Sequence, residues 1–199
     1  EDQPGARDRF SRARLLGIVQ DACNATAYAH AHGVIHRDLK PANIMIGDYG
    51  ETYVVDWGLA KIQARGDDLA TLPGEAPKTP DSGGAMTLEG TVMGTPAYMP
   101  PEQAAGKVKE IDERSDIYSL GAVLYHILTF EPPFTGPASE VISKVQEGRL
   151  TLPSKRVSGE MPGRAEAPGF PESIPPELEA IVLKAMAREK KDRYATARE

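Results

Sequence analysis

Residues 34–58 contain two short apolar runs that a tight turn can join, and no other stretch constrains the fold as strongly. The runs 44–46 and 52–55 are β-prone, and residues 47–51 between them, Gly-Asp-Tyr-Gly-Glu, are rich in turn formers. The pattern predicts a small β-hairpin. Because antiparallel strands return to the same end, the residues just outside the two runs should be neighbours.

Four polar side chains lie at that end of the predicted hairpin. Asn43 precedes the first run, Asp56 follows the second, and Asp38 and Lys40 lie in the segment that enters the hairpin. Carboxylate and amide oxygens are ligands that Mg²⁺ prefers, and a lysine can neutralise a phosphoryl group. Phosphoryl transfer depends mainly on positioning and charge neutralisation, so this set favours that chemistry.

Two motifs within this stretch resemble one enzyme family. Residues 36–43 read HRDLKPAN and resemble the catalytic loop of the bacterial, eukaryotic-like Ser/Thr protein kinases, and residues 56–58, DWG, resemble their Asp-Phe-Gly motif. A lone Asp-x-Gly is a weak signal and fits ordinary turn aspartates. The two motifs together are specific, and the resemblance extends over residues 10–199.

The resemblance implies a role for each polar residue. Asp38 would be the catalytic base and Lys40 would contact the transferred phosphoryl group. Asn43 and Asp56 would hold Mg²⁺, with Mn²⁺ as an alternative, and Met45 would form the floor beneath the adenine of ATP. From periodicity alone, Met45 is a core-facing strand residue.

Residues 56–102 would be the activation segment, with a flexible insert at 63–90 that is rich in small and polar residues. The hydroxyl side chains open to phosphorylation are Thr71, Thr79, Ser82, Thr87 and Thr91, of which the last two are nearest the anchored end. Residues 94–102, GTPAYMPPE, resemble the end of this segment. Thr95 would bond Asp38 and Lys40, which implies Ser/Thr rather than Tyr substrates.

The remaining pattern predicts a mainly α fold of the α+β family, a kinase-like C-terminal lobe with one small hairpin. Helices are expected at 11–32, capped by Ser11 and ended by Gly33, at 116–128, and at 175–187. The helix at 116–128 is apolar on most faces and should be central. Residues 139–147 begin a further helix, 150–173 look irregular, and 195–199 begin a last helix.

Several side chains have two interpretations. The resemblance implies that Asp116 bonds amides of the catalytic loop, its position alone fits an N-cap, and the two roles are expected together. Arg37 would pair with a phosphate on the activation segment or bond loop carbonyls. His30 is interpreted as a surface or helix-end histidine, and the indole N–H of Trp57, in place of Phe, needs a partner if buried.

Three further side chains are assigned structural roles. The resemblance implies that His36 packs beneath the loop and that Glu102 pairs with Arg193. His126 is expected to pack among apolar neighbours.

Composition excludes several classes of protein. The chain has 199 residues, a net charge of −6 and no basic patch in its sequence, which argues against a nucleic-acid partner. Its single cysteine, Cys23, cannot form an internal disulfide and fits a cytoplasmic location. No apolar stretch approaches the roughly 20 residues of a membrane span, although a longer product could be membrane-anchored.

No G-x-G-x-x-G precedes residue 34, so we expect residues 1–199 to be a kinase C-terminal lobe truncated at both ends, without the N-terminal lobe. Such a chain should be inactive or very weakly active by itself. The leading hypothesis is a Ser/Thr protein kinase that uses MgATP and protein substrates. One alternative is a non-catalytic kinase-like scaffold. Another is a small-molecule phosphotransferase, against which the run at 94–102 argues.

Overall fold

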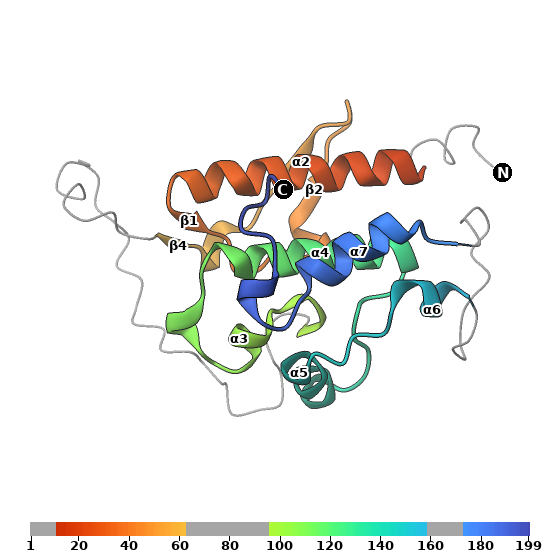
Figure 1. Cartoon of the computed structure of the whole chain (residues 1–199). Helices are drawn as coiled ribbons and strands as arrows, with labels where there is room; N and C mark the ends of the chain where they lie inside the picture. The colour runs from red at the N-terminus through yellow and green to blue at the C-terminus, as the bar shows by residue number, and fades with distance from the viewer. Residues whose placement is uncertain (1–10, 63–95, 159–172) are drawn as a thin grey trace, which may run out of the picture.

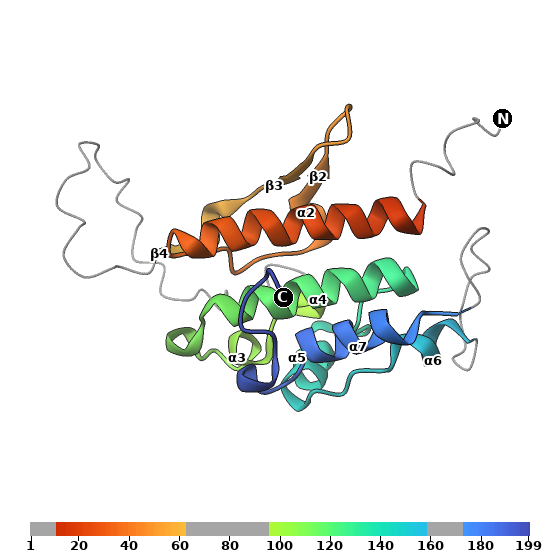
Figure 2. The ribbon, with the colours of Figure 1, turned by 45° about the horizontal axis from the view of Figure 1, so that its top comes forward.

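The computed structural model describes residues 11–62, 96–158 and 173–199. Three helices run side by side through the described part, with α4 (Glu113–Thr129) between α2 (Arg12–Ala31) and α7 (Pro176–Ala185) (Figures 1 and 2). The mainly α prediction is therefore confirmed. The expected insert at 63–90 lies outside the described residues, as do its candidate phosphorylation sites.

The central helix α4 is buried along most of its length. Every residue from 115 to 125 is buried, as is Leu128, which agrees with an apolar pattern that extends around most of the helix. The helix begins three residues before the expected start, because the Asp112 side chain caps it by accepting the Arg114 amide hydrogen at 2.9 Å. The N-cap interpretation of Asp116 is therefore wrong.

Helix α2 begins and ends as the sequence predicts. The Ser11 hydroxyl accepts the amide hydrogen of Arg14, and Gly33 follows the helix with a φ of 73°, a left-handed conformation that glycine adopts without steric cost. Its buried residues, Ile18, Val19, Ala22, Thr26, Ala27 and His30, lie on one stripe.

The predicted hairpin is present. Strand β2 (Ile44–Ile46) pairs antiparallel with β3 (Thr52–Val54), and Met45 lies opposite Tyr53. The Val55 amide donates to the Asn43 carbonyl at 3.0 Å, which continues the ladder toward Asp56. A second ribbon, β1 (Val34–Ile35) with β4 (Lys61–Ile62), was not predicted, since two-residue strands leave no periodic signal.

Shorter elements complete the described part. The helices are α3 (Pro101–Ala104), α5 (Ala138–Glu147) and α6 (Pro153–Val157), and the 3₁₀ turns are η1 (Pro41–Asn43), η2 (Trp57–Leu59), η3 (Pro96–Tyr98), η4 (Val108–Glu110) and η5 (Lys190–Asp192). Helix α6 corrects the expectation of an irregular stretch. Pro153, at its first position, needs no hydrogen-bond acceptor there. Residues 195–199 form turns rather than a helix. No described helix is long and apolar enough to cross a membrane.

Candidate active site

The catalytic-loop sequence is held against α4 by one buried carboxylate. Asp116, which is 1% exposed, accepts the amide hydrogens of His36 and Arg37 at 2.8 Å each. The Nε2–H of His30 donates to the same carboxylate at 2.8 Å. Three donors stabilise a charge that would otherwise be costly to bury. The structure thus confirms that Asp116 bonds the loop amides.

His30 corrects the sequence interpretation. It lies in the last turn of α2, so the helix-end interpretation is confirmed, but it is buried and bonds Asp116 across 86 residues of sequence, so the surface interpretation is wrong. Its position on the buried stripe of α2 was the available signal. Its partner could not be found because the sequence does not show which carboxylate α4 presents to α2.

His36 is a packing and hydrogen-bonding residue, as expected. It is fully buried, its Nε2–H donates to the Val55 carbonyl at 3.0 Å, and its Nδ1 accepts the Asp38 amide hydrogen at 3.3 Å. Both ring nitrogens are therefore occupied, which leaves His36 no free lone pair for proton transfer. It also links the loop to the end of strand β3.

Asp38, Lys40 and Asn43 form one hydrogen-bonded cluster. Lys40 Nζ donates to Asp38 Oδ2 at 2.7 Å. Asn43 Nδ2 donates to the Asp38 carbonyl at 2.8 Å and to its Oδ2 at 3.2 Å. Asp38 Oδ1 takes no part in these bonds, and the side chains of Asp38 and Lys40 remain about a fifth exposed, at 24% and 19%. This arrangement holds a carboxylate and a cation in place at the surface.

Asp56 lies next to this cluster through its backbone. The residue before it, Val55, bonds both Asn43 and His36. Asp56 is exposed and has a φ of 63°, in the left-handed region that aspartate tolerates better than most residues. No described residue donates a hydrogen bond to its carboxylate, which leaves both oxygens available to a ligand.

Trp57 finds the partner that its indole requires. Its Nε1–H donates to the Val54 carbonyl at 2.9 Å, and its ring packs against His36 with centroids 4.5 Å apart. The larger side chain is therefore accommodated between the end of β3 and the catalytic loop. Tryptophan fixes the backbone just past Asp56 by a bond that phenylalanine could not make.

Met45 and Thr95 are not placed in this cluster. Met45 is 56% exposed, so the interpretation of it as a core-facing residue is wrong. It lies opposite Tyr53, which is also exposed, on an open face of the hairpin. Thr95 lies outside the described residues. The sequence just after it is anchored, because Ser119 Oγ donates to the Tyr98 carbonyl at 2.9 Å.

Tyr98 and His126 form a second contact between that sequence and α4. The Tyr98 hydroxyl is hydrogen-bonded to His126 Nδ1. Burial raises the pKa of Tyr98 to about 12 and lowers the pKa of His126 below its ordinary value. His126 is thus partly buried, close to expectation, but its partner is a polar one.

The Glu102–Arg193 pair is present and buried. Arg193 donates to both carboxylate oxygens of Glu102 at 2.9 Å, and Ser115 Oγ adds a third bond at 2.7 Å. Burial alone would raise the pKa of Glu102, but the bonds from Arg193 and Ser115 outweigh it and lower the pKa. The pair joins α3 to the C-terminal end of the described chain.

The donor set fits a divalent ion that arrives with phosphates. Because Asn43 gives its amide hydrogens to Asp38, its amide oxygen can face a ligand, and so can the Asp56 carboxylate, which has no hydrogen-bond donor among the described residues. Residues 11–62, 96–158 and 173–199 contain no cluster of three or more His, Cys, Asp or Glu that could hold a metal. Mg²⁺ commonly binds through one or two protein ligands plus substrate phosphates.

Three features together define a protein of the protein-kinase class. They are a central buried helix, a hairpin that carries an Asp-x-Gly turn, and a loop whose Asp, Lys and Asn side chains are in hydrogen-bond contact. The comparison with known families agrees. The model of the protein kinase domain matches residues 5–199, so the chain belongs to the protein kinase domain family.

Several bacterial protein kinases are similar to this chain. The chain is 40% identical over 188 residues to the serine/threonine-protein kinase PknB of Mycolicibacterium smegmatis and 38% identical over 185 residues to the probable serine/threonine-protein kinase PknB of Bifidobacterium longum. It is 47% identical over 123 residues to the serine/threonine-protein kinase PknD of Protochlamydia amoebophila. These alignments cover 94%, 93% and 60% of the chain but only 25%, 22% and 12% of the relatives.

Proposed function

We propose that this chain carries the catalytic loop of a Ser/Thr protein kinase, which transfers the terminal phosphoryl group of MgATP to hydroxyls of protein substrates. The observation that carries the proposal is the bonded cluster of Asp38, Lys40 and Asn43 beside the Asp56 carboxylate, to which no described residue donates a hydrogen bond. The run at 94–102 and the similarity to bacterial Ser/Thr protein kinases support protein substrates over small molecules. Residues 56–102 would form the activation segment of this lobe.

In this proposal Asp38 orients the substrate hydroxyl and accepts its proton. Oδ2 is fixed by Lys40 and Asn43, so Oδ1 is the atom that faces the hydroxyl. The Lys40 ammonium has three N–H donors and uses one on Asp38, so it can also bind the transferred phosphoryl group. Thr95 would bond both residues in the active form and favour Ser/Thr substrates.

Asn43 and Asp56 would hold Mg²⁺, which neutralises charge on the phosphates when bound. Met45, exposed on β2, would contact the adenine of ATP. Arg37 supports control by phosphorylation, because its Nε is buried and has no partner among the described residues. A phosphate on the activation segment would supply that partner.

The test is phosphoryl transfer from radiolabelled ATP to a generic Ser/Thr protein substrate, catalysed by the full-length protein. Asp38→Asn should lower the rate about 100-fold or more, because positioned general bases typically contribute factors of this size. Asp48→Asn is the matched control, since it makes the same chemical change at an exposed position of the same hairpin and should leave the rate unchanged. Equal measurable rates for Asp38→Asn and the parent would contradict the proposal, and no transfer above background by the parent would favour a non-catalytic scaffold.

A further inference from the structure

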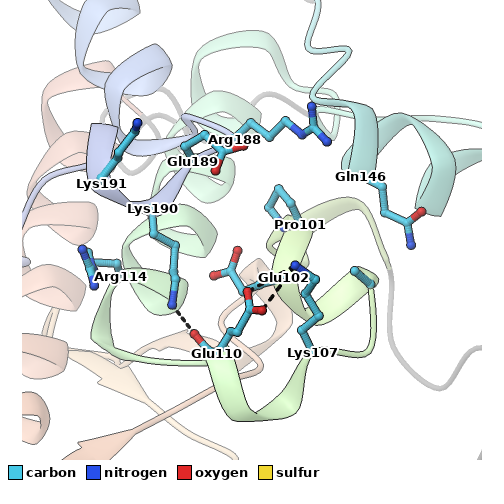
Figure 3. A pocket seen from close by; sticks show the side chains of 11 residues that line it. Pro101, Glu102, Lys107, Glu110, Arg114, Gln146, Arg188, Glu189, Lys190 and Lys191 are labelled. Atoms are coloured by element: carbon cyan, nitrogen blue, oxygen red, sulfur yellow. Dashed lines mark hydrogen bonds and ion pairs between the residues drawn. The ribbon is translucent and has the colours of Figure 1, made fainter.

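A hollow of about 540 Å³ opens on a surface formed by none of the residues discussed as catalytic (Figure 3). Its walls come from three parts of the chain: the region of α3 and η4, the start of α4, and the turn from α7 into η5. The end of α5 contributes Gln146. The floor includes the buried Glu102, so the Glu102–Arg193 pair closes the hollow from behind.

The hollow carries more positive than negative charge, although the protein as a whole is acidic at −6. Its cationic lining residues are Lys107, Arg114, Arg188, Lys190 and Lys191, and its acidic ones are Glu102, Glu110 and Glu189. Two of the cations, Arg114 and Lys190, share one carboxylate, that of Asp112, at 2.9 and 3.0 Å. The hollow therefore keeps an excess of positive charge after these ion pairs are counted.

Arg188 is an exposed residue whose aliphatic stem lies against the backbone. A Cβ at Gly148 would lie 3.3–3.6 Å from the Cβ, Cγ and Cδ atoms of Arg188, so the arginine stem lies on the glycine at the end of α5. Gly148 itself has a φ of 68°. In Figure 3 the Arg188 side chain lies along the rim of the hollow between Glu189 and Gln146. Its guanidinium fork is thus presented at the opening.

Lys107 offers a second cation on the opposite rim. Its bond to Glu110 spans 3.3 Å between side chains that are 57% and 53% exposed. Exposed pairs of this kind contribute little energy, so an incoming anion can compete for the ammonium. The hollow therefore presents cations from both rims over a buried, charge-neutral floor.

We propose that this hollow binds an acidic peptide segment, through carboxylate or phosphate-ester groups on consecutive side chains. The volume is much larger than a single inorganic anion requires, and the cations lie on opposite rims, which suits several anionic groups along a chain. Guanidinium binds both kinds of group bidentately. The proposal does not depend on phosphoryl transfer by this protein.

The test is fluorescence anisotropy of the purified protein with two labelled probes, a hexaglutamate peptide and a Gly-Ser peptide with two consecutive phosphothreonines. Binding of at least one probe, weakened by salt, is expected. The double variant Lys107→Gln/Arg188→Gln should bind about tenfold more weakly, whereas Glu189→Gln should bind about twofold more tightly. Lys155→Gln, on exposed α6 surface, should not change binding. Thermal melting confirms that each variant folds.

The pattern across probes identifies the anion. Binding of both supports a site for carboxylates and phosphate esters, and binding of the phosphothreonine peptide alone supports a site selective for the doubly charged group. Absence of binding by either probe at millimolar concentration would overturn the proposal. So would an affinity that is the same in the parent, the double variant and Glu189→Gln.

Discussion

The carboxylate of Asp116 organises the loop that carries the proposed catalytic residues. It accepts bonds from a helix side chain and from two consecutive loop amides, one of them on Arg37 at a φ of 72°. Such a left-handed non-glycine residue persists only where its surroundings hold it. The geometry at Asp38, the next residue, therefore depends on a side chain in the middle of the buried core.

Asp116→Asn tests this dependence. An amide can accept with one oxygen only, and its NH₂ faces donors, so at least one loop amide loses its partner. We expect a loss of roughly 1–3 kcal/mol in the free energy of unfolding and faster hydrogen exchange at the amides of His36 and Arg37. Urea titration and NMR exchange measure both. Asp48→Asn is the control, and unchanged exchange at the loop in Asp116→Asn would contradict the account.

The position of a single side chain could be predicted where a motif specified it, but not where its bonding partner lies far away in the sequence. The bonds among Asp38, Lys40 and Asn43 follow from local sequence. The bond from His30 to Asp116 does not, since it joins residues 86 positions apart. Met45 shows another limit, because strand alternation cannot show which hairpin face stays open.

Helix packing between α4 and α7 depends on one glycine. A Cβ at Gly121 would lie 2.7 Å from the Ala185 Cβ and 3.0 Å from the Met186 Cγ, so no larger residue fits without moving one helix. This close contact explains why Gly121 belongs to the buried stripe of α4 although it contributes no side chain.

Gly121→Ala and Gly17→Ala form a matched pair. The first should lower the free energy of unfolding by about 1–3 kcal/mol through overpacking. The second lies on α2 with no atom within 4 Å of the added Cβ, so its higher helix propensity should raise stability by about 0.5–1 kcal/mol. Urea denaturation measures the change in the free energy of unfolding that each variant causes. The two changes should have opposite signs if the α4–α7 contact is as described, and the same sign if it is not.

At the level of elements, the sequence predicted long periodic helices well and short elements poorly. Helix α2 and the hairpin were found because a cap, a left-handed glycine and a turn mark their ends. The β1–β4 ribbon and helix α6 were missed because elements of so few residues leave no periodic pattern, and whether they form depends on the rest of the fold. The predicted start of α4 is late because Asp116 fits an N-cap by its position, whereas the cap is Asp112 and Asp116 lies buried within the helix.

The bidentate pair of Glu102 and Arg193 joins distant parts of the whole molecule. The Arg193 side chain is fully buried, and its remaining donors bond the carbonyls of Ala187, Arg188 and Arg114. Arg193→Ala would leave the Glu102 charge buried without its partner and should lower the free energy of unfolding by about 3–5 kcal/mol. Arg198→Ala, at an exposed position nearby, should have little effect. Equal melting temperatures for the two variants would show that the Glu102–Arg193 pair does not stabilise the fold.

The same pair predicts how stability depends on pH. The pKa of Glu102 is lower in the folded protein than its ordinary value of 4.5, so the ionised carboxylate stabilises the fold above that pH. This contribution is lost as the pH falls below about 4.5 and Glu102 is protonated. The free energy of unfolding should therefore decline more steeply with acidification in the parent than in Glu102→Gln, as chemical denaturation at a series of pH values can show.

The proposed function requires that the loop containing Asp38 and Asn43 and the turn beginning at Asp56 surround one metal–phosphate site. Paramagnetic broadening of the backbone NMR spectrum by Mn²⁺ with ATP measures this directly, and it detects weak binding. We expect the amide signals of Asp38, Asn43 and residues 56–58 to broaden, while those of α5 stay sharp. Broadening that spares Asn43 and Asp56, or that centres on another part of the chain, would contradict the claim.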